Sequence, residues 1–147
     1  MALTAPRPRP DNPPRSVTIL GSTGSVGCNT IDLIVRHPDA FSVETLTGNK
    51  NIAVLADQAR RLRPKLAVVG DPGGYRALKD ELDGTGIEVA AGAEALIEAA
   101  NRPADWVMAA IVGAAGLEPT LAAVRRGAVV GLANKECLVC AGDLMVR

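Results

Sequence analysis

Aromatic residues are almost absent from this sequence of 147 residues. Phe, Trp and Tyr occur once each and together make up 2% of the chain, whereas hydrophobic residues in total make up 48%. With so few aromatic side chains, the core must be built from Ala, Val, Leu and Ile, which suits helices that pack closely on a parallel sheet. The length suits a single domain with a sizeable core.

The chain also has no formal net charge and few cysteines. The 16 basic and 16 acidic side chains cancel to a formal charge of +0, so the chain lacks the concentrated basic surface that binds nucleic acids or membranes. Three cysteines are too few for a zinc ribbon or a disulfide framework, and we expect Cys137 and Cys140 to lie near a helix start rather than to form a redox pair. The sequence therefore favours a small-molecule partner, and it shows no metal site.

Long hydrophobic runs are missing as well. No apolar stretch reaches the roughly 18 residues that a membrane span needs, and the N-terminus has no apolar signal core. We therefore expect a cytoplasmic protein without membrane contact. Residues 1–15 are rich in Pro and Arg and are predicted to form a disordered tail, which leaves residues 16–147 as the folded domain.

A glycine-rich turn is the most informative feature that the sequence does contain. The segment Gly21-Ser22-Thr23-Gly24-Ser25-Val26-Gly27 follows the apolar run at residues 17–20 and opens a helical pattern, which is carried by Val26, Thr30, Leu33 and Ile34. A strand, a tight turn and a helix in this order direct free N–H groups at an anion such as a pyrophosphate. The glycine spacing differs from Gly-x-Gly-x-x-Gly, so an ordinary turn is an alternative, but the context favours a dinucleotide site.

Strands and helices alternate along the rest of the chain. The expected strands cover residues 17–20, 41–47, 66–69, 87–90, 106–111 and 128–133, and the helices between them include residues 72–82, 93–100 and 119–126. Six alternating strands predict a Rossmann-like α/β fold, a doubly wound parallel sheet with helices on both faces. A further helix begins near Lys135 and is cut at Arg147. We expect the chain to be the N-terminal part of a longer enzyme, with a small natural binding domain as the alternative.

The loop after the second strand indicates which cofactor binds. NAD sites carry an Asp or Glu about 20 residues beyond the glycines, whereas this loop reads Thr47-Gly48-Asn49-Lys50-Asn51 and holds no acid. Glu44 lies three residues earlier, roughly 10 Å short of the loop. Lys50 would attract a ribose phosphate, with Asn49 and Asn51 as neutral donors, so the loop favours NADP. A solvated loop lysine is the alternative for Lys50.

Two further motifs follow the fifth and sixth expected strands. These are Gly113-Ala114-Ala115-Gly116 and Asn134-Lys135-Glu136. The carboxyl ends of parallel strands form the edge where ligands bind. A helix start explains Asn134 as N-cap and Glu136 in the first turn, but a cation at Lys135 is unfavourable there without a nearby anion. Lys135 therefore points to an anionic substrate.

Three segments in this order, residues 17–27, 108–117 and 132–136, resemble the 1-deoxy-D-xylulose 5-phosphate reductoisomerase family, and the resemblance runs from about residue 16 to residue 147. It implies an NADPH-dependent oxidoreductase of non-mevalonate isoprenoid synthesis, which converts 1-deoxy-D-xylulose 5-phosphate to 2-C-methyl-D-erythritol 4-phosphate. It also implies a divalent metal, magnesium or manganese, and a homodimer of the full-length protein.

The resemblance also implies roles for individual residues. The pyrophosphate would be held by Thr23, Gly24, Ser25 and Val26, and the ribose phosphate by Asn49, Lys50 and Asn51. At the other end, Asn134 and Glu136 would flank the nicotinamide, and Lys135 would reach the sugar-phosphate substrate. The family's metal-binding acidic cluster, lid and C-terminal domain lie downstream of Arg147, so no catalytic residue or metal ligand is expected here. We expect this chain to bind NADPH without turnover.

Two alternatives remain open. Homoserine and semialdehyde dehydrogenases have cofactor domains with a related glycine turn, although the Gly-Ala-Ala-Gly-Leu run and Glu136 speak against them. An NADP-sensing module without chemistry is the other alternative, and the abrupt end at Arg147 speaks against it.

Overall fold

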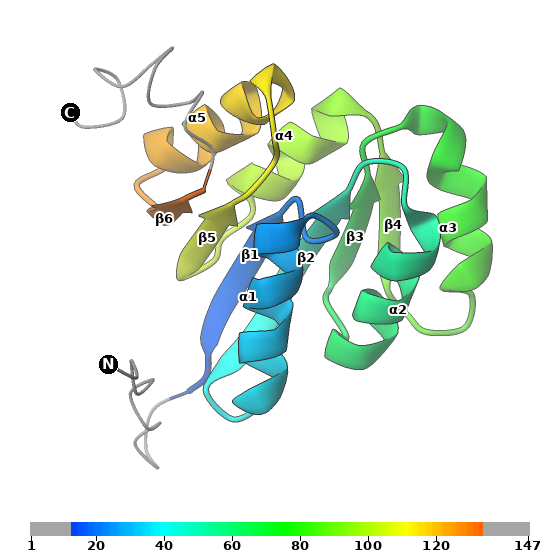
Figure 1. Cartoon of the computed structure of the whole chain (residues 1–147), viewed down its shortest axis with the longest axis horizontal. Helices are drawn as coiled ribbons and strands as arrows, with labels where there is room; N and C mark the ends of the chain where they lie inside the picture. Colours follow the sequence, from blue (N-terminus) through cyan, green and yellow to red (C-terminus); the bar gives the residue numbers. More distant parts are fainter. Residues whose placement is uncertain (1–12, 134–147) are drawn as a thin grey trace.

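The computed structural model describes residues 13–133, which form a six-stranded parallel sheet between two layers of helices (Figure 1). The strands are β1 (Arg15–Leu20), β2 (Phe41–Gly48), β3 (Leu66–Val69), β4 (Glu88–Ala91), β5 (Trp106–Ala109) and β6 (Val129–Leu132). The helices are α1 (Ser25–Arg36), α2 (Ile52–Leu62), α3 (Tyr75–Glu81), α4 (Ala93–Asn101) and α5 (Leu117–Arg125), with short 3-10 turns η1 (Pro72–Gly74) and η2 (Ala114–Gly116). Every strand pair is parallel, so the predicted fold class is confirmed.

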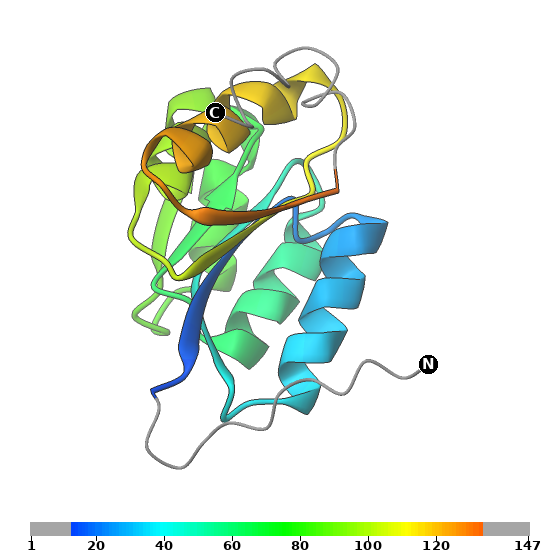
Figure 2. The ribbon, with the colours of Figure 1, turned by 90° about the vertical axis from the view of Figure 1, so that its left-hand side faces the viewer.

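The strand order is β4-β3-β2-β1-β5-β6. The chain builds outward from β1 to β4 and then returns to place β5 on the other side of β1. Helices α1, α2 and α3 cover one face of the sheet, and α4 and α5 lie together on the opposite face, as Figure 2 shows from the side. The direction in which successive strands are added to the sheet therefore reverses between β1 and β5. Open parallel sheets bind their ligands at such a reversal point.

Each face of the sheet has its own aliphatic core. On the first face, Ile19, Leu46 and Leu55 are fully buried among β1, β2 and α2. On the second face, the alanines of α4 and α5 pack against β1, β3 and β5, and Ala99 and Ala123 are fully buried there. Small side chains let these helices lie close to the sheet, so the predicted core of Ala, Val, Leu and Ile is confirmed.

The buried face of α1 is only partly the predicted one. The residues of this helix that the structure buries are Gly27, Thr30, Ile31 and Ile34. Val26 and Leu33, which the helical pattern included, are 42% and 47% exposed. The reason is the contact at Gly27, where a Cβ atom would lie 2.2 Å from the carbonyl oxygen of Gly21. This close approach sets the rotation of α1, because the helix side that carries Gly27 must face the turn.

Several element ends differ from the predicted ones. The predicted helix 72–82 begins as the 3-10 turn η1, in which the N–H of Gly74 donates to the backbone carbonyl of Asp71 at 3.0 Å and the side chain of Asp71 caps the N–H of Gly73. The expected strand 106–111 ends at Ala109, and β6 is likewise shorter than expected. At the start of the domain, β1 includes Arg15, whose N–H donates to the carbonyl of Ala40 at 2.9 Å.

Some predictions concern residues outside the described range. These are the tail up to residue 12, the Asn134-Lys135-Glu136 motif, Cys137, Cys140 and the expected last helix. Within residues 13–133, none of the helices combines the length and the apolar character that crossing a bilayer requires.

Candidate cofactor-binding site

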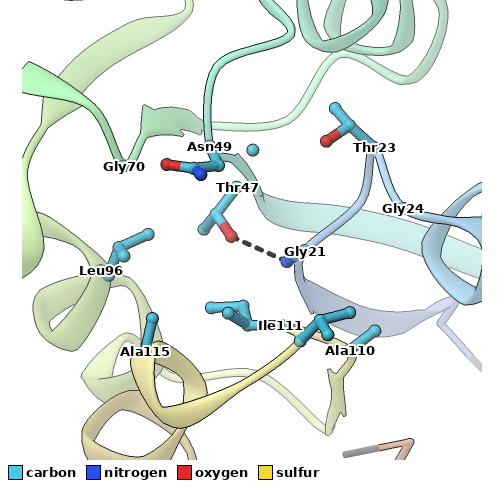
Figure 3. Close-up of a pocket in the computed structure, with 12 residues that line it drawn as sticks. Gly21, Thr23, Gly24, Thr47, Asn49, Gly70, Leu96, Ala110, Ile111 and Ala115 are labelled. Carbon is cyan, nitrogen blue, oxygen red and sulfur yellow. Dashed lines mark hydrogen bonds between the residues drawn. The ribbon is translucent and has the colours of Figure 1, made fainter. Parts of the chain in front are cut away.

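A pocket of about 250 Å³ opens at the carboxyl edge of the sheet, beside the ends of β1 and β5 (Figure 3). The glycine-rich turn lines it with Gly21, Thr23 and Gly24, and the end of β2 with Thr47, Gly48 and Asn49. The other lining residues are Gly70, Leu96, Ala110, Ile111, Val112 and Ala115. Figure 3 shows Leu96 and Ala115 across the pocket from the glycine-rich turn. The pocket thus lies at the edge where the sequence predicted a ligand.

The three glycines of the turn have different surroundings. Gly21 has a φ of +84°, and a Cβ atom there would lie 2.7 Å from the backbone carbonyl of Ala110. Gly27 is blocked by the turn itself. Gly24 instead has an ordinary φ of −77°, and a Cβ atom would come no closer than 3.8 Å to any atom outside its immediate chain neighbours. The fold therefore needs glycine at positions 21 and 27, whereas no close contact within the described part of the protein requires glycine at position 24.

Backbone N–H groups at the start of α1 are free to bind an anion. In the described part of the chain, no hydrogen-bond acceptor takes the N–H groups of Thr23, Ser25 or Val26. The first bonded N–H of the helix is that of Cys28, which donates to the carbonyl of Gly24 at 2.8 Å. No side chain caps the helix, and its first turn holds no acid. A helix N-terminus with several free N–H groups favours a phosphate group.

Two neighbouring elements hold the turn in place. The hydroxyl of Thr47 at the end of β2 accepts a hydrogen bond from the N–H of Gly21 at 2.9 Å (dashed in Figure 3). The N–H of Ser22 donates to the carbonyl of Thr47 at 2.7 Å. On the other side, Gln58 of α2 makes two hydrogen bonds with Ser22. These anchors were not predicted from the sequence. The available signal was Gln58, a polar residue three positions after Leu55 on the apolar face of α2.

The predicted ribose-phosphate residues lie in the loop between β2 and α2, and one of the three reaches the pocket. Asn49 lines the pocket, and Lys50 is exposed beside it. Asn51 is the N-cap of α2, and its side-chain oxygen accepts from the N–H of Val54 at 3.2 Å. This cap leaves the amide nitrogen of Asn51 as a donor. The loop therefore offers one ammonium group and amide donors, and no carboxylate.

Glu44 is the only acid of β2, and it is engaged elsewhere. Its side chain is 8% exposed and lies 3.2 Å from the ammonium of Lys65 and 3.1 Å from the guanidinium of Arg102. It is inside the strand, as the sequence indicated, and both of its oxygens are paired with cations. Glu44 therefore does not take the place of the ribose-binding acid of an NAD site.

The remaining predicted site residues are placed as follows. Ser25 and Val26 are exposed in the first turn of α1. In the second motif Gly113 has a φ of +79° and precedes η2, from which Ala115 reaches the pocket. Asn134, Lys135 and Glu136 follow β6 and lie outside the described residues. Among residues 13–133, no group of three or more His, Cys, Asp or Glu side chains is arranged to hold a metal.

Comparison with known proteins identifies the family. The sequence model of the family described as 1-deoxy-D-xylulose 5-phosphate reductoisomerase matches residues 17–142. The chain belongs to this family. The reductoisomerase of Rhodospirillum centenum is 66% identical over 132 residues, which cover 90% of this chain and 33% of that protein. That of Gluconobacter oxydans is 59% identical over 133 residues, again 90% of this chain and 33% of the relative.

Solved reductoisomerase structures have the same fold. The enzyme from Zymomonas mobilis in complex with NADPH superposes with a TM-score of 0.90 at 56% identity, over 92% of this chain and 36% of that one. A reductoisomerase in complex with NADPH, fosmidomycin and magnesium gives a TM-score of 0.84 at 41% identity, over 90% of this chain and 33% of the other. The chain thus spans about a third of the length of its relatives. These matches favour the reductoisomerases over the homoserine and semialdehyde dehydrogenases.

Proposed function

We propose that this chain binds NADPH in the pocket beside β1 and β5, as the cofactor-binding part of a 1-deoxy-D-xylulose 5-phosphate reductoisomerase. The observation that carries the proposal is the set of free N–H groups at Thr23, Ser25 and Val26 around the open space at Gly24. A relative of this family is in complex with NADPH. When bound, NADPH supplies the hydride for a reduction.

The protein's own residues bind and orient the cofactor. The pyrophosphate-binding residues are Thr23, Gly24, Ser25 and Val26, and the ribose-phosphate residues are Asn49, Lys50 and Asn51. An exposed ammonium at Lys50 and paired oxygens on Glu44 favour the phosphorylated ribose of NADPH over the free hydroxyls of NADH. By the family resemblance, Asn134 and Glu136 flank the nicotinamide, and Lys135 reaches the substrate.

The complete reaction belongs to the whole protein. The family resemblance supports a substrate that is a sugar phosphate, 1-deoxy-D-xylulose 5-phosphate, and a product that is 2-C-methyl-D-erythritol 4-phosphate. It also supports a divalent metal, and relatives are in complex with magnesium. The proposal further includes a cytoplasmic homodimer, which the family resemblance supports. It includes no nucleic-acid or membrane partner, because the charges of the sequence are balanced.

Two measurements on the 147-residue chain test this function. NADPH at about 100 times its Kd should stabilise the folded state by about 2.7 kcal/mol and raise Tm by roughly 5–10 °C. An unchanged Tm at saturating NADPH would contradict the cofactor assignment. In a second assay with 1-deoxy-D-xylulose 5-phosphate, NADPH and magnesium or manganese, we expect no product. Product formation would show that the chain carries catalytic residues that this account does not assign.

A further inference from the structure

Gln58 of α2 makes two hydrogen bonds to a single residue of the glycine-rich turn. The hydroxyl of Ser22 donates to Oε1 of Gln58 at 2.7 Å, and Nε2 of Gln58 donates to the carbonyl oxygen of Ser22 at 2.9 Å. Ser22 is fully buried and Gln58 is 4% exposed. A buried amide whose two ends are both paired holds its partner in one orientation, because any other arrangement leaves buried polar atoms without a bond.

The direction of the Ser22 carbonyl sets the direction of the next N–H group. The peptide bond is trans, so the N–H of Thr23 points away from the oxygen of Ser22. That oxygen points into the protein, where the thiol of Cys28 also lies 3.7 Å from it. The N–H of Thr23 therefore points away from Gln58, and Thr23 is one of the residues that line the pocket. In the described part of the chain, no acceptor takes this N–H.

The helix that carries Gln58 also carries the second phosphate-binding segment. The loop with Asn49, Lys50 and Asn51 ends at the N-cap of α2, and Gln58 lies seven residues further along that helix. Seven residues are about two helical turns, or roughly 10 Å. Helix α2 thus connects the two segments that are proposed to hold the pyrophosphate and the ribose phosphate.

We infer that Gln58 is a positioning residue for the cofactor pyrophosphate. It does not touch NADPH; it holds the Ser22–Thr23 peptide so that the N–H of Thr23 faces the phosphate oxygens. The inference rests on the proposed function, and it adds Gln58 of α2 to the residues that act on the pyrophosphate.

The test compares a ligand that has the pyrophosphate with one that lacks it. In Gln58→Leu, which removes both hydrogen bonds, we expect the Kd for NADPH to rise about tenfold or more, because the pyrophosphate loses an oriented donor. Adenosine 2′-monophosphate keeps the ribose phosphate and has no pyrophosphate, so its Kd should change less than about threefold. Both affinities are measured by calorimetry on the 147-residue chain.

A control separates positioning from general destabilisation. Leu62 is the last residue of α2, about one helical turn or roughly 6 Å beyond Gln58, and it packs against the core of the first sheet face without a hydrogen bond to the glycine turn. Leu62→Ala should lower Tm and leave both affinities within about twofold of the wild type. If Gln58→Leu does not fold, Ser22→Ala removes only the hydroxyl bond and should raise the NADPH Kd about three- to tenfold, again without affecting adenosine 2′-monophosphate.

Three results would overturn the inference that Gln58 positions the pyrophosphate donor. If the Gln58→Leu chain, or Ser22→Ala where that chain does not fold, binds NADPH as tightly as the wild type, the Ser22 contact does not orient the pyrophosphate donor. If both ligands weaken by the same factor, the contact supports only the structure of the site as a whole. A wild-type chain that does not bind NADPH overturns the proposed function, and this inference falls with it.

Discussion

The carbonyl oxygen of Gly21 lies 2.2 Å from the point where a Cβ atom on Gly27 would stand. The first and last glycines of the turn therefore pack directly on each other and fix the start of α1 against the end of β1. The middle glycine, Gly24, has no such contact, since its hypothetical Cβ would be 3.8 Å from the nearest atom outside its immediate neighbours. The fold requires two glycines of the turn, and the third leaves open space in which a ligand could approach the backbone.

This division predicts different effects for two alanine substitutions in one turn. Gly27→Ala introduces a backbone clash and should destabilise the chain by about 1–3 kcal/mol, or roughly 3–10 °C in Tm. Gly24→Ala should leave Tm nearly unchanged and weaken NADPH binding about tenfold or more, because the added methyl group obstructs the pyrophosphate. Thermal melts and NADPH titrations measure the two effects. A Gly24→Ala chain with wild-type affinity would show that no ligand approaches this turn closely.

Lys50 is predicted to select NADPH over NADH. Lys50→Ala removes the ammonium that is proposed to pair with the ribose phosphate, so the NADPH Kd should rise about tenfold or more while the NADH Kd changes little. Lys79→Ala is the matched control, since Lys79 is an exposed lysine on α3, outside the pocket lining. An equal loss of affinity for both cofactors in Lys50→Ala would rule out Lys50 as the selector.

Two neighbouring alanines test whether the pocket holds the cofactor. Ala114 and Ala115 are both exposed in η2, but only Ala115 lines the pocket. Ala115→Leu should narrow the cavity and weaken NADPH binding about tenfold or more. Ala114→Leu adds the same volume outside the cavity and should leave the Kd within about twofold. Equal effects of the two substitutions, read by fluorescence titration, would place the cofactor elsewhere.

Glu44 is predicted to matter for stability and not for the cofactor. Glu44→Gln removes the charge that pairs with Lys65 and Arg102, and we expect a loss of about 1–3 kcal/mol in the free energy of unfolding, with the NADPH Kd unchanged. Glu88 also contacts Arg102 at 3.4 Å but is exposed, so Glu88→Gln should cost less than about 1 kcal/mol. Urea unfolding gives both values. A fall in cofactor affinity in folded Glu44→Gln would mean that this acid acts in the site.

The alternation of strands and helices could be predicted because it depends on local patterns. Apolar runs such as Leu66–Val69 are visible in the sequence, and the structure confirms this strand. The buried face of α1 could not be read correctly, because apolar side chains lie on several sides of this helix. Its rotation depends on the contact between Gly27 and Gly21, which is a tertiary contact.

The parts of the candidate site that have a local sequence signature could be predicted. The glycine turn and the loop with Lys50 each have a sequence signature, and the structure places both beside one pocket. The side chains that hold the glycine turn in place have no sequence signature. Thr47 and Gln58 act through hydrogen bonds to residues 26 and 36 positions earlier, and only the packing of α2 and β2 brings them there.

A fluorescence titration of the 147-residue chain with NADPH and, in parallel, with NADH tests whether this pocket is an NADPH-selective site. We expect saturable binding of NADPH and a Kd for NADH that is at least about tenfold higher, because Lys50 is proposed to contact the ribose phosphate, which NADH lacks. Equal affinity for the two cofactors, or no binding of either, would contradict an NADPH-selective site in this chain.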